Sequence, residues 1–144
     1  MTLDHADYEA PDVPLGGGPV RAYLSGPIDD DRGCFMMDVA TDALAEAGFL
    51  VTSPLNIRRA IAASEHFDPV DIAAVYDDGM IRESIGRDVR FLLNCDAIVM
   101  LVGWATDTSS CWEYSHAVGA GLDELYWSPA AGLVPLDDAP AEIV

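Results

Sequence analysis

The sequence contains no lysine, and all seven of its basic side chains are arginines. This absence excludes enzymes that form a Schiff base through lysine and nucleotide-binding proteins that depend on a P-loop lysine. Cysteine is also scarce: Cys34, Cys95 and Cys111 are odd in number and show no C-x-x-C spacing. We therefore expect free thiols in a reducing compartment, with no disulfide framework, no metal site and no cofactor.

Positive charge is scarce as well, since 7 basic residues stand against 25 acidic ones and the net charge is −18. Nucleic-acid polymers and anionic membrane surfaces are bound by clustered lysine and arginine, so neither is expected as a partner. No apolar run approaches the roughly 20 residues that span a bilayer. The N-terminus is acidic where a signal peptide would be basic and then apolar. We expect a cytoplasmic protein that binds a small molecule.

The chain does have enough apolar sequence for one packed domain, because about half of its 144 residues are apolar. Residues 1–18 are acidic and contain proline and a glycine run, so we interpret them as a flexible arm. Strand and helix patterns alternate through residues 19–144. This alternation predicts a single α/β domain with an open parallel sheet, flavodoxin-like or Rossmann-like, and helices on both faces.

The predicted elements place the loops that would carry a site. Strands are predicted at 20–24, 49–52 and 97–102, with weaker ones at 125–127 and 132–136, and helices at 34–47, 57–64, 80–94 and from 109 or 110 to 121. Residues 56–79 are interpreted as a lid. Parallel sheets bind ligands beyond the carboxyl ends of their strands, so a site is expected in the loops 25–33, 53–56 and 103–110.

Asp88 breaks the amphipathic pattern of its predicted helix. It follows Ile85 by three residues and precedes Leu92 by four, so it lies on the flank of the apolar stripe. A carboxylate there must be hydrogen-bonded, neutralised or directed into a pocket, and such carboxylates gather at functional sites. The structural alternative is a helix-edge aspartate that pairs with Arg82 or Arg87 across the surface.

Glu113 has two competing interpretations. The four residues from Ser110 to Glu113 match S-x-x-E, a capping box that is purely structural. Glu113 also shares a helix face with the small residues Ala117, Ala120 and Gly121, and it lies in the first turn after the longest apolar strand. The helix dipole favours an ionised carboxylate there. An ionised, partly buried carboxylate at this edge is what a nucleophile requires.

Other residues near the same edge have ordinary structural alternatives. Asp107, within Thr-Asp-Thr-Ser-Ser, is typical of a turn. Tyr23 and Trp104 fit aromatic side chains at the edge of a sheet. A Cys-His hydrolase would need Cys111 and His116, but residues five apart on a helix do not face each other well.

Three blocks of the sequence carry a family resemblance. The first is Tyr23-Leu24-Ser25-Gly26-Pro27-Ile28, after the first predicted strand, and it is similar to a Y-L-[AS]-G-P motif. The second comprises Arg87-Asp88, residues 95–99 and Gly103-Trp104. The third is Asp107 and, after five residues, Glu113, similar to a D-x5-E signature. Together they resemble the nucleoside 2-deoxyribosyltransferases and related N-glycosidases, over residues 20–122, with the order and spacing of the blocks kept.

The resemblance implies a role for each matched residue. Glu113 would attack C1′ of the sugar and form a covalent glycosyl-enzyme, and Asp88 would pass a proton to the leaving base. Tyr23 would help to hold Glu113, and Asp107 would hydrogen-bond the sugar 5′-hydroxyl. Departure of the base leaves an oxocarbenium-like centre that an anion stabilises, so two carboxylates suit this chemistry. The other substrate-binding residues are expected to be Ser25, Gly26, Pro27, Trp104, Ser109 and Ser110.

Three functions stay open on the sequence. The first is cleavage or transfer of the N-glycosidic bond of a (deoxy)nucleoside, and the resemblance implies a homo-oligomer. The second is hydrolysis of the N-glycosidic bond of a (deoxy)nucleoside 5′-monophosphate. Relatives that cleave nucleotides have a serine at the position that Asp107 occupies here. The negative charge of Asp107 disfavours a phosphate, although Ser109, Ser110 and the helix N-terminus offer hydrogen-bond donors to one. The third is a nucleotide-sensing module in which Glu113 only caps its helix, supported by Trp112 in place of a small residue.

Overall fold

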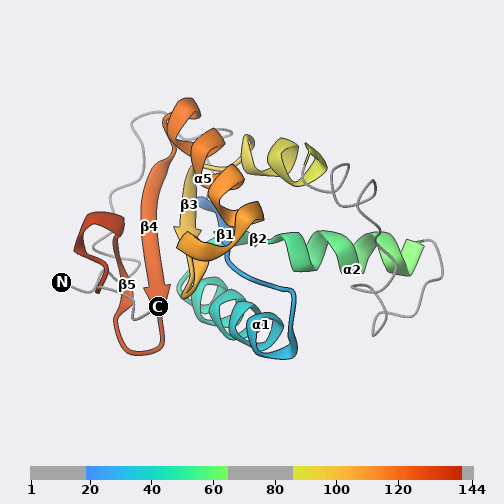
Figure 1. The fold of residues 1–144 in the computed structure, drawn as a ribbon, viewed down its shortest axis with the longest axis horizontal. Coiled ribbons are helices and arrows are strands. Elements are labelled where there is room, and N and C mark those ends of the chain that lie inside the picture. The colour runs from blue at the N-terminus through green and yellow to red at the C-terminus, as the bar shows by residue number, and fades with distance from the viewer. Residues whose placement is uncertain (1–18, 65–85, 141–144) are drawn as a thin grey trace.

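The computed structural model of the protein describes residues 19–64 and 86–140 (Figure 1). The predicted arm (1–18) lies outside the described residues, as do residues 65–79 of the predicted lid and the start of the predicted helix at 80–94. The described residues form one α/β domain on a five-stranded sheet, as predicted. No helix in these two ranges is long and apolar enough to cross a membrane.

The elements lie close to the predicted positions. The strands are β1 (Arg21–Ser25), β2 (Leu50–Thr52), β3 (Ala97–Met100), β4 (Asp123–Ser128) and β5 (Gly132–Pro135). The helices are α1 (Asp31–Glu46), α2 (Pro54–Ser64) and α5 (Thr108–Ala120), with a helical segment at 86–92 and the 3-10 turns η3 (Trp104–Thr106) and η4 (Leu136–Asp138). The largest differences are at the starts of the helices, because the capping side chains determine the residue at which each helix begins.

The sheet has the strand order β2-β1-β3-β4-β5. The first four of these strands are parallel, and β5 runs antiparallel to β4. In this flavodoxin-like order the winding of the chain reverses between β1 and β3, and ligands bind beyond the carboxyl ends of the strands there. The predicted open parallel sheet is confirmed, with one antiparallel edge. The connection at 129–131 is too short for a parallel crossover and allows only a hairpin.

Helices cover both faces of the sheet, as predicted (Figure 1). α1 packs on one face, and α2, the segment at 86–92 and α5 contribute to the other. The core on the α1 face includes Leu24, Met37, Ala40, Leu44 and Val99. The core on the opposite face includes Tyr23, Ile57, Leu92, Ile98 and Ala117. Successive strand residues point to opposite faces, so β1 directs Leu24 to one core and Tyr23 to the other.

Two helices begin earlier than predicted because polar side chains cap them. The Asp30 carboxylate accepts a hydrogen bond from Gly33 N at 2.7 Å, so α1 begins three residues before the predicted start. α2 begins at Pro54, directly after β2, where the Ser53 hydroxyl accepts a hydrogen bond from Asn56 N at 3.1 Å. Proline fits the first turn, because a helix leaves the N–H groups there without intrahelical partners.

Candidate active site

Glu113 lies in the second turn of α5, with its side chain 3 % exposed. The helix begins earlier than predicted because Asp107 caps it. The Oδ2 atom of Asp107 accepts hydrogen bonds from Ser110 N at 3.0 Å and from Ser110 Oγ at 2.6 Å. The interpretation of Glu113 as the closing residue of a capping box is therefore wrong, and its buried carboxyl group needs another explanation.

Two hydroxyl groups from β1 hold the Glu113 carboxyl group. The Tyr23 hydroxyl donates a hydrogen bond to Oε2, and the Ser25 hydroxyl donates one to Oε1 at 2.8 Å. Tyr23 and Ser25 are two residues apart on one strand, so their side chains point to the same face of the sheet. Both are fully buried. The carboxyl group is thus fixed at the carboxyl end of β1, beside the point where the winding reverses.

Asp88, on the helical segment at 86–92, is the second buried carboxyl group of the site. Its side chain is 2 % exposed, and Oδ1 has no hydrogen-bond partner among the residues that the structure describes. Burial raises the pKa of Asp88 to about 6, although the charges of Arg58 and Arg87 oppose this rise. The surface position proposed as the structural alternative is therefore wrong, and Arg82 lies outside the described residues.

The two carboxyl groups influence each other. Burial raises the pKa of Glu113 to about 8, and the hydrogen bonds from Tyr23 and Ser25 oppose the rise. The negative charges of Asp88 and Asp107 raise the pKa of Glu113 further. Burial, together with the charges of Glu113 and Asp88, holds the pKa of the Tyr23 hydroxyl well above its usual value. Tyr23 therefore stays protonated and keeps donating to Glu113.

Arg58, on α2, belongs to this site and was not predicted. Its positive charge lowers the pKa of both Asp88 and Tyr23, so it lies on the same side of the domain as the carboxyl groups. Its neighbour Arg59 pairs with Asp38 of α1 at 2.7 Å. Successive helix residues are about 100° apart around the axis, so Arg58 and Arg59 point in different directions. The sequence shows the two arginines but not which one turns inward.

Gly26 and Pro27 lie where the ends of β1 and β3 come together. A Cβ atom on Gly26 would be 2.9 Å from Leu101 Cβ, and one on Gly103 would be 3.0 Å from the Pro27 ring. Gly103 also has a φ of 87°, which favours glycine. These close approaches give Gly26 and Pro27 a packing role at the carboxyl edge of the sheet. Their substrate contacts stay a prediction.

The other predicted contact residues lie in the loop after β3 and at the start of α5. The Trp104 ring packs against Tyr114, with ring centroids 5.0 Å apart. The Ser110 hydroxyl is buried and donates to Asp107, whereas Ser109 is half-buried. Of the two serines proposed to receive a phosphate, Ser110 therefore already uses its hydroxyl hydrogen within the protein.

The outer part of α5 holds the residues that the alternative functions needed. Trp112 is 56 % exposed, and its ring centroid lies 6.3 Å from that of His116. The Cys111 thiol faces backbone carbonyl oxygens of η3, so it does not pair with His116. Of the three small residues predicted to pack on the sheet, Ala117 is buried and the other two are exposed where the helix ends.

The site offers two carboxyl groups in different environments. Glu113 accepts hydrogen bonds from two hydroxyl groups, which suits a positioned nucleophile. Asp88 has an oxygen without a hydrogen-bond partner in the described residues and a pKa near 6, which suits proton transfer. Within residues 19–64 and 86–140, no three histidine, cysteine or carboxylate side chains are grouped to hold a metal ion. Two carboxyl groups in different environments, as Glu113 and Asp88 are here, are typical of glycosyl-bond chemistry.

Comparison with solved structures identifies the fold. The chain is similar to a 2-deoxyribosyltransferase from the psychrotolerant bacterium Bacillus psychrosaccharolyticus, with a TM-score of 0.59 and 17 % sequence identity over 87 % of this chain and 86 % of that one. The chain has the 2-deoxyribosyltransferase fold. No family model matches the sequence, and a search of curated proteins finds no match. The resemblance seen in the three sequence blocks is thus confirmed by the fold.

Within the 2-deoxyribosyltransferase fold, the motifs that carried the resemblance occupy one region. Tyr23 and Ser25 of β1 donate hydrogen bonds to Glu113 of α5, and the charge of Asp107, which precedes α5, acts on the same carboxyl group. At 17 % identity the likeness concerns the fold, so the reaction must be argued from these side chains.

The buried Glu113 predicts a pH-dependent cost in stability. Its pKa rises from an ordinary 4.5 to about 8 on folding, so between these values the folded state holds a proton that the unfolded chain releases. Stability therefore falls as pH rises through this window, by at most about 1.4 kcal/mol per pH unit for one group. Chemical denaturation of the wild type and Glu113→Gln at pH 5 to 8 should show a growing advantage for the variant. A constant difference across this range would contradict the raised pKa.

Proposed function

We propose that the protein cleaves or transfers the N-glycosidic bond of a (deoxy)nucleoside through a covalent glycosyl-Glu113 intermediate. The observation that carries this proposal is the buried Glu113 carboxyl group, held through both oxygens by Tyr23 and Ser25. A carboxylate oriented in this way at the carboxyl edge of the sheet can approach the anomeric carbon without rearranging.

The reaction has two steps. An oxygen of Glu113 attacks C1′ while the bond from C1′ to the base nitrogen breaks, and Asp88 gives its proton to the departing nitrogen. In the second step a nucleophile, either water or the nitrogen of an acceptor base, attacks C1′ and releases Glu113. The proton that the attacking water or acceptor nitrogen loses passes to Asp88, so the protein ends as it began.

A nucleoside is favoured over a 5′-monophosphate. Asp107, Asp88 and Glu113 place three carboxyl groups around the site, and the negative charges of the first two reach Glu113. A phosphate beside Asp107 would meet a like charge. The Ser110 hydroxyl, one of its expected donors, already binds Asp107. We therefore infer that Asp107 acts both as the cap of α5 and as the contact for a sugar hydroxyl.

The sensing module is less well supported than the enzyme. That alternative needed Glu113 as a helix cap, whereas Asp107 caps α5 and Glu113 binds Tyr23 and Ser25. It also needed Trp112 to change the sugar site, whereas this side chain is 56 % exposed. Both observations favour turnover over binding alone.

Chromatography of free bases tests the function. The protein is incubated with each deoxynucleoside and with its 5′-monophosphate, with and without added adenine. Base release without an acceptor indicates a hydrolase, and release only with adenine indicates a transferase. Release from monophosphates alone would overturn the preference for nucleosides. Binding without any release would support the sensing module instead.

Replacing Tyr23 by phenylalanine should lower kcat/KM about tenfold to a hundredfold, the usual range for a lost hydrogen bond to a charged group. The pKa of Glu113 should rise, because the Tyr23 hydroxyl now lowers it. The alkaline limb of the pH profile of kcat/KM follows the higher pKa of the pair formed by Asp88 and Glu113, so it should move to higher pH. Tyr114→Phe is the matched control, since the Tyr114 hydroxyl binds Glu124 at 2.7 Å. Equal losses in both variants, without a shifted profile, would contradict the positioning role of Tyr23.

A further inference from the structure

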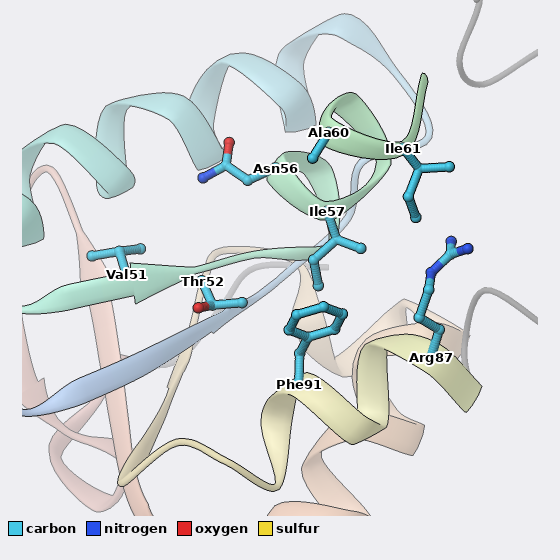
Figure 2. Close-up of a pocket in the computed structure, with 8 residues that line it drawn as sticks. All are labelled: Val51, Thr52, Asn56, Ile57, Ala60, Ile61, Arg87 and Phe91. Atoms are coloured by element: carbon cyan, nitrogen blue, oxygen red, sulfur yellow. The ribbon is translucent and has the colours of Figure 1, made fainter. Parts of the chain in front are cut away.

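A pocket separate from the carboxyl groups lies between β2, α2 and the helical segment at 86–92 (Figure 2). It has a volume of about 350 Å³. None of Tyr23, Ser25, Asp88 and Glu113 lines it. Thr52, which does line it, pairs with Tyr23 in the sheet, so the pocket lies one strand nearer the edge than the candidate active site.

The walls of the pocket are mostly apolar and include one aromatic ring. Val51, Ile57, Ala60 and Ile61 supply aliphatic surface, and Phe91 supplies the ring. Figure 2 shows Phe91 reaching from the 86–92 segment toward Ile57 of α2. The Phe91 side chain is 46 % exposed, although it is large and apolar. An aromatic surface of this kind favours a flat ring stacked on it or set against its edge.

Among the residues that the structure describes, Arg87 supplies the charged group of the pocket, and its charge also acts on the Asp88 carboxyl group. Arg87 lines the pocket and Figure 2 shows it beside Ile61, while the other polar residues there, Thr52 and Asn56, are neutral. None of the described residues that line the pocket is acidic, although the whole chain has 25 acidic and 7 basic residues. The guanidinium group of arginine matches carboxylate and phosphate oxygens in geometry as well as charge.

We propose that this pocket binds a small ligand made of a flat aromatic ring with one attached anionic group. The ring lies against Phe91 between the aliphatic walls, and the anionic group meets Arg87. The volume falls within the range of small-molecule sites and is large enough for a two-ring compound. Such a site binds without chemistry, so its test does not depend on the proposed function.

Isothermal titration calorimetry with three naphthalene compounds tests this site. 1-Naphthoate and 1-naphthyl phosphate carry an anionic group, and 1-naphthalenemethanol is the neutral match. At least one anion should bind one-to-one and about tenfold more tightly than the alcohol, the effect of one charge-assisted contact. The tighter anion then shows whether the site prefers a carboxylate or a phosphate. Equal binding of all three compounds, or none, would overturn the proposal.

Variants locate the bound ring. Phe91→Ala should weaken binding about fivefold or more, whereas Phe35→Ala, which removes an exposed phenylalanine from α1, should leave it unchanged. Arg87→Gln should remove the preference for the anion, and Arg32→Gln on α1 should keep it. Ala60→Leu should block the pocket at an unchanged melting temperature. Binding that survives Ala60→Leu and Phe91→Ala, or is lost in Glu113→Gln, would place the ligand elsewhere and refute the site.

Discussion

Replacing Glu113 by glutamine is expected to reduce base release from a deoxynucleoside about a thousandfold or more, because the amide cannot form the glycosyl ester. The change keeps the size of the side chain, and the amide oxygen can still accept a hydrogen bond from Tyr23 or Ser25. Acid-quenched mass spectrometry should show the wild type carrying the mass of the bound sugar, and the variant carrying none. Loss of turnover together with loss of the adduct identifies Glu113 as the nucleophile.

Glu124→Gln is the matched control for this experiment. Glu124 also accepts a hydrogen bond from a tyrosine, but it lies near the start of β4, away from the carboxyl edge of the sheet. This variant should release base at about the wild-type rate, within roughly twofold, as expected for a change outside the site. Activity retained in Glu113→Gln would remove the covalent mechanism, and an adduct in that variant would place the nucleophile on another residue.

The place of the site could be predicted from the sequence, because it follows from the topology. The apolar run at 97–102 indicated a central parallel strand, and parallel strands bring their carboxyl ends to one edge. That Tyr23 and Ser25 share a face of the sheet also follows from the sequence, because side chains two residues apart on a strand point to the same side. Their bonds to Glu113 join residues about 90 positions apart in the chain, a contact that no local pattern encodes.

The role of Glu113 could not be decided from the sequence, because two caps were available. Ser110 and Glu113 fit a capping box, while Asp107 and Ser110 have the same three-residue spacing one turn earlier. The earlier cap forms because Asp107 binds both the N–H and the hydroxyl of Ser110. Once Ser110 lies inside the helix, Glu113 is free to reach β1.

Two features of the fold illustrate different limits of prediction. A parallel sheet was predicted, whereas β5 is antiparallel, because the connection at 129–131 has three residues and a parallel crossover needs a dozen or more. Arg58 was not predicted either, because its direction depends on how α2 packs beside the segment at 86–92. Ile57 of α2 and Leu92 of that segment belong to the same buried cluster, and the amphipathic pattern of either helix alone does not show how the two helices pack in it.

The last prediction concerns the proton supplied by Asp88. The pKa values are about 6 for Asp88 and about 8 for Glu113. When this pair of carboxyl groups holds one proton, the proton is therefore mostly on Glu113. The reaction needs the opposite arrangement, which is about one hundredth of this form, since the values lie two pH units apart. The proton count is the same in both arrangements. The profile of kcat/KM should therefore be a bell with limbs near pH 6 and pH 8, which belong to the pair jointly.

Asp88→Asn should lower kcat/KM about a hundredfold to ten-thousandfold, the usual contribution of a general acid. The alkaline limb should disappear, because no proton on residue 88 remains to be lost. The pKa of Glu113 should fall, since the charge of Asp88 now raises it. A 4-nitrophenyl 2-deoxyriboside, whose phenolate departs without a proton, should react in the variant at nearly the wild-type rate. If this substrate loses as much activity as the nucleoside, Asp88 acts through the structure of the site and not by donating a proton.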